Sequence, residues 1–390
     1  MNSLRSILLW MLIGCITCCM TKPASADSSS GHNRPPDSIA RIRTDLQLAQ
    51  NPDAPAAPAD AETAEPATTT DSLIDKQVGS QKCIECHDHA GEAWKHTHHF
   101  NTYNELHSRP KAAEIAKNMN IRRIKRADTC TQCHYTVMTV DDKPKSVSGI
   151  SCESCHGAAR DWIDIHNDFG GPGVQRNQET EDHRKLRLEK TEKAGMIRPD
   201  QLYRLAENCY QCHTVPNEQL VNVGGHKAGS NFELVRWLSG EVRHNFSISD
   251  SARKNKEASI ERKRMLYVIG QILDMEYGFR GVAKATEKDA YAVSMAKRAK
   301  RARKRLQKIQ NLVNPAPDGN AVPELIEILK LAQQKLKLNN NTALTSAADE
   351  ISVLAQKFVA EHDGSELAAI DSLLPGPDKY RGTVYNVDQP

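Results

Sequence analysis

The sequence predicts an all-α protein with little regular sheet, in which a region of short helices precedes a C-terminal helical bundle. In residues 251–374, apolar side chains recur at i, i+3, i+4 and i+7, the spacing of one face of an α-helix. Residues 77–250 are instead interrupted by cysteine pairs and by the glycine-rich stretch 170–173, so their helices are expected to be short.

The composition narrows the class of protein. The chain has 390 residues, of which 39% are hydrophobic and only 5% aromatic, with a formal net charge of +3. A mean hydropathy of -0.59 excludes a polytopic membrane protein, and the small net charge gives no reason to expect nucleic acid as a partner. The shortage of aromatic side chains suggests that something other than side chains fills part of the core.

The N-terminus predicts export. Residues 1–26 combine Arg5, an apolar run and the sequence A-S-A at 24–26, which together are typical of a secretory signal peptide. The alternative is a lipoprotein signal with lipid on Cys15, which would add a membrane tether. Either processing route predicts a periplasmic or otherwise extracytoplasmic mature chain. Residues 27–76 follow as a disordered linker, because their alanines, prolines and acids cannot bury a core.

The eight cysteines that remain after cleavage form four C-x-x-C pairs, each followed directly by histidine. The motifs span 83–87, 130–134, 152–156 and 209–213. This spacing allows two thiols to form thioethers with one haem while the histidine binds the iron from one side. The predicted cofactor-binding cysteines are Cys83, Cys86, Cys130, Cys133, Cys152, Cys155, Cys209 and Cys212, and the proximal ligands are His87, His134, His156 and His213.

Zinc and disulfides are the alternative uses of these cysteines. The 18 residues between the second and third pairs would suit a zinc ribbon, and an oxidising compartment permits disulfides. Neither alternative explains a histidine after every pair. We therefore predict four covalently bound haem c groups in residues 77–250, whose apolar surfaces would replace the missing aromatic side chains.

Two stretches resemble a known family. The segment A-W-K-H-T-H-H at 93–99 and the segment G-I-S-C-E-S-C-H-G at 149–157, with the order of the four motifs, look like the tetrahaem cytochrome c-554 family. The resemblance covers roughly residues 80–246. It implies that His99 binds the third iron from the distal side, His166 the first and His244 the fourth.

The second iron is the point of departure from that family, in which it keeps an open face. In this chain His226 follows two glycines, and His107 lies in a stretch expected to be helical. Either histidine could close the second iron, and an open face is the third possibility. His89, His96 and His183 are interpreted as solvent-exposed side chains.

Three helical faces are predicted in the bundle of residues 251–374, around Ile269, after Pro323 and from Leu344 onward. Turns are expected at 314–319 and 339–341, and an extended tail over residues 375–390. The run 297–308 contains eight basic residues. They form a solvated helix face, a surface that docks on the acidic haem domain, or a surface that steers an acidic redox partner.

These observations predict an exported electron carrier that passes single electrons between redox partner proteins. An enzyme acting on nitric oxide or hydroxylamine at an open second haem is the alternative, and a structural scaffold in a larger complex is a third. The sequence does not identify the donor or the acceptor.

Overall fold

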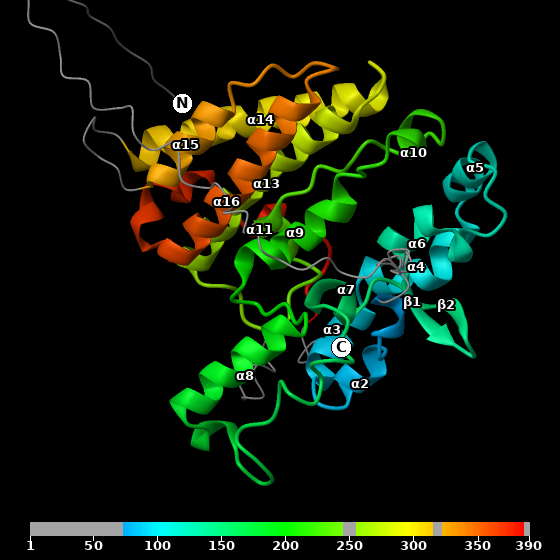
Figure 1. Ribbon diagram of the computed structural model, residues 1–390, viewed down its shortest axis with the longest axis vertical. Coiled ribbons are helices and arrows are strands. Elements are labelled where there is room, and N and C mark those ends of the chain that lie inside the picture. Colours follow the sequence, from blue (N-terminus) through cyan, green and yellow to red (C-terminus); the bar gives the residue numbers. More distant parts are fainter. Residues whose placement is uncertain (1–72, 245–254, 315–321, 386–390) are drawn as a thin grey trace, which may run out of the picture. The chain divides into compact units, whose positions relative to one another are not determined.

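The computed structural model describes residues 73–244, 255–314 and 322–385 (Figure 1). Helix makes up 61% of the structure and strand 4%, which confirms the all-α prediction. The predicted signal peptide, the Cys15 lipidation site and nearly all of the linker lie outside the described residues. None of the helices in these ranges is both long enough and apolar enough to span a membrane.

The first part of the described chain consists of short α-helices separated by loops and 3-10 turns. Most of these helices end within a motif or two residues before a glycine, as the interruptions in the sequence predict. The α-helices are α2 (Ser80–Ile84), α3 (Asp88–Lys95), α4 (His98–Glu105), α5 (Pro110–Asn118), α6 (Asp128–His134), α7 (Cys152–His156), α8 (Glu181–Lys193), α9 (Leu202–His213), α10 (Glu218–Asn222) and α11 (Leu234–Leu238).

One antiparallel hairpin interrupts the helices. Strand β1 (Thr136–Val140) pairs with β2 (Lys143–Ser148), with Val140 opposite Lys143. The two turn residues, Asp141 and Asp142, have φ of 52° and 56°, which is the left-handed pair that a two-residue hairpin turn requires. The hairpin lies between the second and third motifs and accounts for most of the small strand content.

The C-terminal part is a bundle of four helices, α13 (Ile260–Lys284), α14 (Ala290–Val313), α15 (Pro323–Leu331) and α16 (Asn341–Glu361). Helix α13 is almost entirely buried because it packs against α14, α16 and α9 (Figure 1). The predicted apolar faces are the buried faces, and Pro323 occupies the first turn of α15 as expected. The predicted turn at 339–341 is shorter in the structure, because Asn341 already begins α16.

Two 3-10 helices follow α16. Ser365–Leu373 lies within the predicted bundle, whereas Pro377–Lys379 is a single turn in the segment expected to be extended. Arg381 exchanges backbone hydrogen bonds with Arg236 and Glu241. These pairings fix the tail against the end of α11, close to a predicted iron ligand at His244.

Buried apolar side chains are distributed very unevenly along the chain. Between residues 73 and 201 the buried hydrophobic side chains are Ala93, Ala116, Tyr135, Ala159 and Trp162. A continuous core begins at residue 202 and extends to residue 370, so it joins α9 and α11 to the bundle. The segment that holds three of the four motifs therefore has almost no apolar core of its own, as expected if haems supply it.

Candidate haem centres

Each of the four motifs lies on a helical turn, which places its two thiols and its histidine on the same side of that turn. In α6, α7 and α9 the motif forms the last turn of the helix, so residues three and four apart share a face. The first motif begins in α2 and continues the turn, with the His87 N–H donating to the Cys83 carbonyl at 2.8 Å. Both thiols and the histidine of each motif can therefore face one porphyrin.

Each motif histidine faces a second histidine from a distant part of the chain. The four ring-centroid separations are nearly equal: 6.4 Å for His87–His166, 6.4 Å for His134–His226, 6.3 Å for His156–His244 and 6.2 Å for His213–His99. An imidazole nitrogen binds a metal at about 2 Å and lies about 1.1 Å from its ring centroid, so two imidazoles on one metal separate their centroids by about 6 Å. All four pairs fit one iron between two axial histidines.

Hydrogen bonds orient several of these rings. A carbonyl oxygen can only accept, so a histidine that bonds a carbonyl through Nδ1 carries its proton there and leaves Nε2 free for a metal. Four ligand candidates have this arrangement: His156 to Ile197, His166 to Ile163, His226 to Lys227 and His244 to Val242. His213 differs, because its Nδ1 lies 3.3 Å from the hydroxyl of Ser230.

Burial favours the neutral form of these histidines, which is the form that binds iron. Loss of solvent lowers the pKa of His134, His213 and His244 to about 4. Burial also lowers the pKa of His87, His99, His156 and His166. These seven rings are therefore unprotonated at neutral pH and available as ligands.

The motifs adjoin one another in a definite order. The thiols of Cys83 and Cys152 lie close enough that each shifts the pKa of the other, and Glu153 of the third motif accepts hydrogen bonds from Val78 and Gly79 just before the first, which places the first and third centres side by side. The thiols of Cys133 and Cys212 likewise shift each other's pKa, and the Cys212 thiol donates to the Gln132 carbonyl at 3.7 Å, which joins the second centre to the fourth. The Asn208 amide, next to Cys209, donates to the Cys155 carbonyl at 2.9 Å and links the third centre to the fourth. The centres therefore form a continuous series in the order first, third, fourth, second.

Two of the pairings implied by the family resemblance are exchanged in the structure. His99 was expected to serve the third iron and His244 the fourth, but His99 faces His213 and His244 faces His156. The chain after α11 is held at residue 241 by the hydrogen bond to Arg381, and three residues later His244 lies against His156 of the third motif.

The other histidines are used differently. His98, which adjoins His99, hydrogen-bonds the carboxylate of buried Glu241 at 2.6 Å instead of facing a motif histidine. His107 is exposed, and so is His96, which stacks on Tyr385. His89 and His183 were expected to be exposed but are only partly so, at 25% and 31% of the side chain.

The cysteines show no sign of the zinc alternative. Nowhere in the ranges that the structure describes do three or more histidine, cysteine or acidic side chains converge as ligands of a bare metal ion. All eight motif cysteines are free thiols rather than disulfides.

Comparison with known proteins identifies a family for part of the chain. Residues 82–157, which include the first three motifs, match the family described as cytochrome c554 and c-prime. We refer to residues 82–157 as the cytochrome c554 domain, after the family that they match. The family resemblance that the motifs indicated is thereby confirmed.

The chain is also similar to a cytochrome over a longer stretch. Cytochrome c-554 of Nitrosomonas europaea is 27% identical over 143 residues, which make up 35% of this chain and 56% of that protein. The match thus spans little more than half of the relative's length. No solved structure matches the chain.

Glu153 is a residue of the cytochrome c554 domain whose role the sequence did not reveal. It is 3% exposed, and its carboxylate accepts hydrogen bonds from the backbone N–H groups of Val78, Gly79 and Ala159 at 2.8 to 2.9 Å. These bonds join the chain before the first motif to the third motif. Its position between the two cysteines of C-E-S-C-H marks it as part of the motif. The sequence of the motif does not show, however, that its carboxylate binds backbone groups far away in the chain.

Aromatic side chains pack against two of the histidine ligand candidates, His213 and His166. Phe232 stacks on His213 at 4.3 Å, and Trp237 lies 5.8 Å from the same ring. Trp162 contacts His166 edge-on at 5.5 Å. These aromatic rings therefore pack against the ligand candidates of the first and fourth centres.

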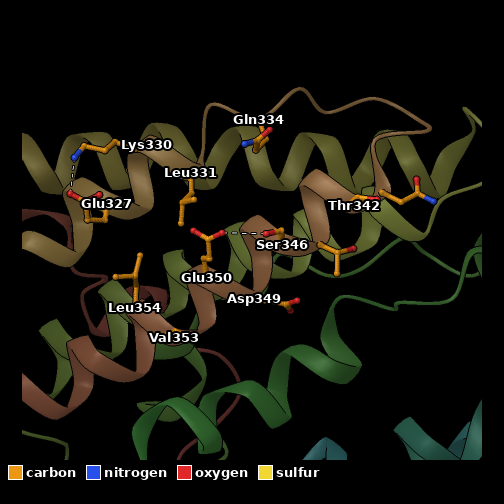
Figure 2. A pocket seen from close by; sticks show the side chains of 12 residues that line it. Glu327, Lys330, Leu331, Gln334, Thr342, Ser346, Asp349, Glu350, Val353 and Leu354 are labelled. Carbon is orange, nitrogen blue, oxygen red and sulfur yellow. Dashed lines mark hydrogen bonds and ion pairs between the residues drawn. The ribbon is translucent and has the colours of Figure 1, made fainter. Parts of the chain in front are cut away.

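A concave surface lies on the bundle (Figure 2). It is an open groove between α15 and α16 in which Glu327 pairs with Lys330 and Ser346 donates to Glu350. Its lining includes exposed Val353 but neither cysteine nor histidine. The groove therefore has no ligands for haem iron.

Proposed function

We propose that this chain is an exported tetrahaem c-type cytochrome that carries single electrons between redox partner proteins. The observation that carries the proposal is the presence of four histidine pairs with nearly equal separations, each containing one motif histidine. A chance arrangement would not give every motif histidine a partner at the spacing that one iron requires.

The protein's part in this chemistry is to hold the ligands and keep water away. Haem, when bound, supplies an iron that changes its charge by one electron. Two histidine ligands on each iron keep the coordination the same in both oxidation states, so little rearrangement accompanies transfer. The backbone carbonyls that accept from Nδ1 strengthen the ligands and favour oxidised iron, which lowers the reduction potential.

The order of the centres supports a relay rather than four separate sites. Contacts between motif cysteines connect first to third and second to fourth, and the Asn208 hydrogen bond connects third to fourth. An electron that enters at either end of this series has a continuous route to the other end. This arrangement favours a carrier with separate sites for its donor and its acceptor.

The alternative function, catalysis at an open second iron, needs a second centre without a distal ligand. His226 faces His134 at the same separation as the other three pairs, so the geometry favours a closed site. Electron transfer is therefore the function that the arrangement supports best.

The partners are proposed to be acidic proteins. Seven of the eight basic residues in the run 297–308 are exposed on α14, and among the described residues none of the seven has a carboxylate partner within ion-pair distance. An unpaired basic face attracts acidic surfaces and speeds their association at low ionic strength. Export is supported by the sequence of residues 1–26 and by the covalent haem motifs.

The test is the spectrum of the mature protein, produced with a cytochrome c maturation system. We expect the mass of four haems on each chain and an oxidised spectrum in which all the iron is low-spin. Fewer than four haems would refute the tetrahaem assignment. A high-spin component that shifts on addition of nitric oxide would favour the enzyme.

A further inference from the structure

We propose that helix α14 of the bundle positions iron ligands of the second and fourth haem centres, with Ser294 and Arg298 as the positioning residues. The inference rests on the haem binding proposed above. It concerns residues outside the cytochrome c554 domain, and it gives the C-terminal bundle a role in the redox sites.

The argument begins with the segment 218–230, which lies against α14 and the loop before it. Hydrogen bonds attach this segment to residues 286–298 at four successive places, in the same order along both segments. They run from the Thr286 N–H to Glu218 at 2.9 Å, from the Tyr291 N–H to Asn222 at 3.0 Å, from the Ser294 hydroxyl to the Ala228 carbonyl at 2.9 Å, and from the Arg298 guanidinium to the Ser230 carbonyl at 3.1 Å.

The attached segment contains one ligand candidate, His226, and one residue that contacts another ligand, Ser230. His226 faces His134 and is the distal ligand candidate of the second centre. Ser230 places its hydroxyl 3.3 Å from Nδ1 of His213, and its N–H donates to the His213 carbonyl at 3.1 Å. The last two attachments, from Ser294 and Arg298, lie on either side of Gly229 and therefore hold the stretch that joins these two groups.

Gly229 shows how closely α14 approaches the fourth centre. Its φ is 77°, and a Cβ at this position would lie 2.6 Å from Arg298 and 3.3 Å from the His213 carbonyl. Only glycine combines this backbone conformation with so close an approach. The guanidinium of Arg298 therefore lies directly behind the loop that contacts the proximal histidine.

Arg298 is suited to a fixed position. It is 4% exposed, and its guanidinium forms an ion pair with buried Asp274 of α13 while a second nitrogen donates to Ser230. The planar guanidinium can bond both partners at once without rotating. Arg298 is the one basic residue of the run 297–308 that points inward, and this distinguishes it from the solvated face around it.

The test uses variants that release the segment without leaving a buried charge. Ser294→Ala removes one attachment, and the double variant Asp274→Leu/Arg298→Met removes the ion pair and the second attachment together. Arg301→Met is the matched control, because Arg301 is an exposed arginine one turn further along the same helix. For each holoprotein we would measure haem content by mass, spin state by electron paramagnetic resonance, and the four reduction potentials by spectroelectrochemistry.

We expect every variant to bind four haems. The double variant should show two changes, in spin state and in one reduction potential, and Ser294→Ala should show the same changes more weakly. The first is a high-spin signal from at most about a quarter of the iron, because only the second centre loses its distal ligand. One of the four potentials also rises, because a weaker hydrogen bond at Nδ1 makes His213 a weaker donor. Arg301→Met should match the unmodified protein in haem content, spin state and potentials, which are measured without a redox partner.

Unchanged spin state and potentials in both variants, with all four haems bound, would overturn the inference. Equal loss of all four haems from Ser294→Ala would also overturn it, since that result reports general unfolding. A failure of the proposed function is distinguishable, because it would appear as missing haem or high-spin iron in the unmodified protein.

Discussion

The closing of the second iron by His226 can be tested by removing that side chain. In His226→Ala the ring that faces His134 at 6.4 Å is lost, and no other described histidine takes its place. The backbone around it cannot easily bring in a substitute, because the His226 N–H is bonded to the Leu220 carbonyl at 3.1 Å. The second iron should therefore become five-coordinate or take water.

The size of the effect follows from the number of centres. With four irons in each chain, opening one converts about a quarter of the iron from low-spin to high-spin and leaves the rest unchanged. The reduced variant should also bind close to one carbon monoxide per chain, whereas the unmodified protein should bind almost none.

The assay is spin quantitation by electron paramagnetic resonance together with titration by carbon monoxide. His107→Ala is the matched control, because His107 was the competing candidate and is exposed. The reasoning is refuted if His107→Ala produces the high-spin signal, or if the unmodified protein already contains a high-spin quarter that His226→Ala does not increase.

Three further predictions concern stability and partners. Glu153→Gln should lower the free energy of unfolding by about 1–3 kcal/mol, because a buried carboxylate that accepts three N–H bonds is replaced by an amide with one accepting atom. The denaturant midpoint measures this loss, and an unchanged midpoint would contradict the prediction. Hydrogen bonds from Arg187 lower the pKa of Glu179 to about 2, so this carboxylate stabilises the fold fully above its ordinary pKa of about 4.5 and the stabilisation is lost as the pH falls toward 2. Glu179→Gln should therefore flatten the acid side of the stability profile, whereas the exposed control Asp182→Asn should not. Exposed basic residues of α14 can be replaced by glutamine at Lys300, Arg301 and Lys304. The triple variant should be reduced more slowly by an acidic donor protein at low ionic strength, and its reduction rate should lose most of its salt dependence. A rate that keeps its full salt dependence would count against docking on this face.

Local patterns in the sequence were sufficient for much of the fold and for half of each site. Apolar spacing predicted the faces of α13, α15 and α16, because a helix that buries one side must repeat its apolar residues every three or four positions. The C-x-x-C-H spacing predicted the cysteines and proximal histidines, because that chemistry is confined to five consecutive residues. The β1–β2 hairpin was not predicted, since its turn is formed by two aspartates rather than by the usual glycine.

Tertiary structure decided everything that joins distant residues. The choice of His99 over His98 depends on which ring faces His213 and which meets Glu241. The exchange of His99 and His244 between the third and fourth centres depends on where the chain is held after α11. Spacing along the sequence contains no information about either, because ligands separated by tens to more than a hundred residues are brought together only by packing of the intervening helices. The inward turn of Arg298, within a run of otherwise solvated basic residues, is determined in the same way by the packing of α14 on α13.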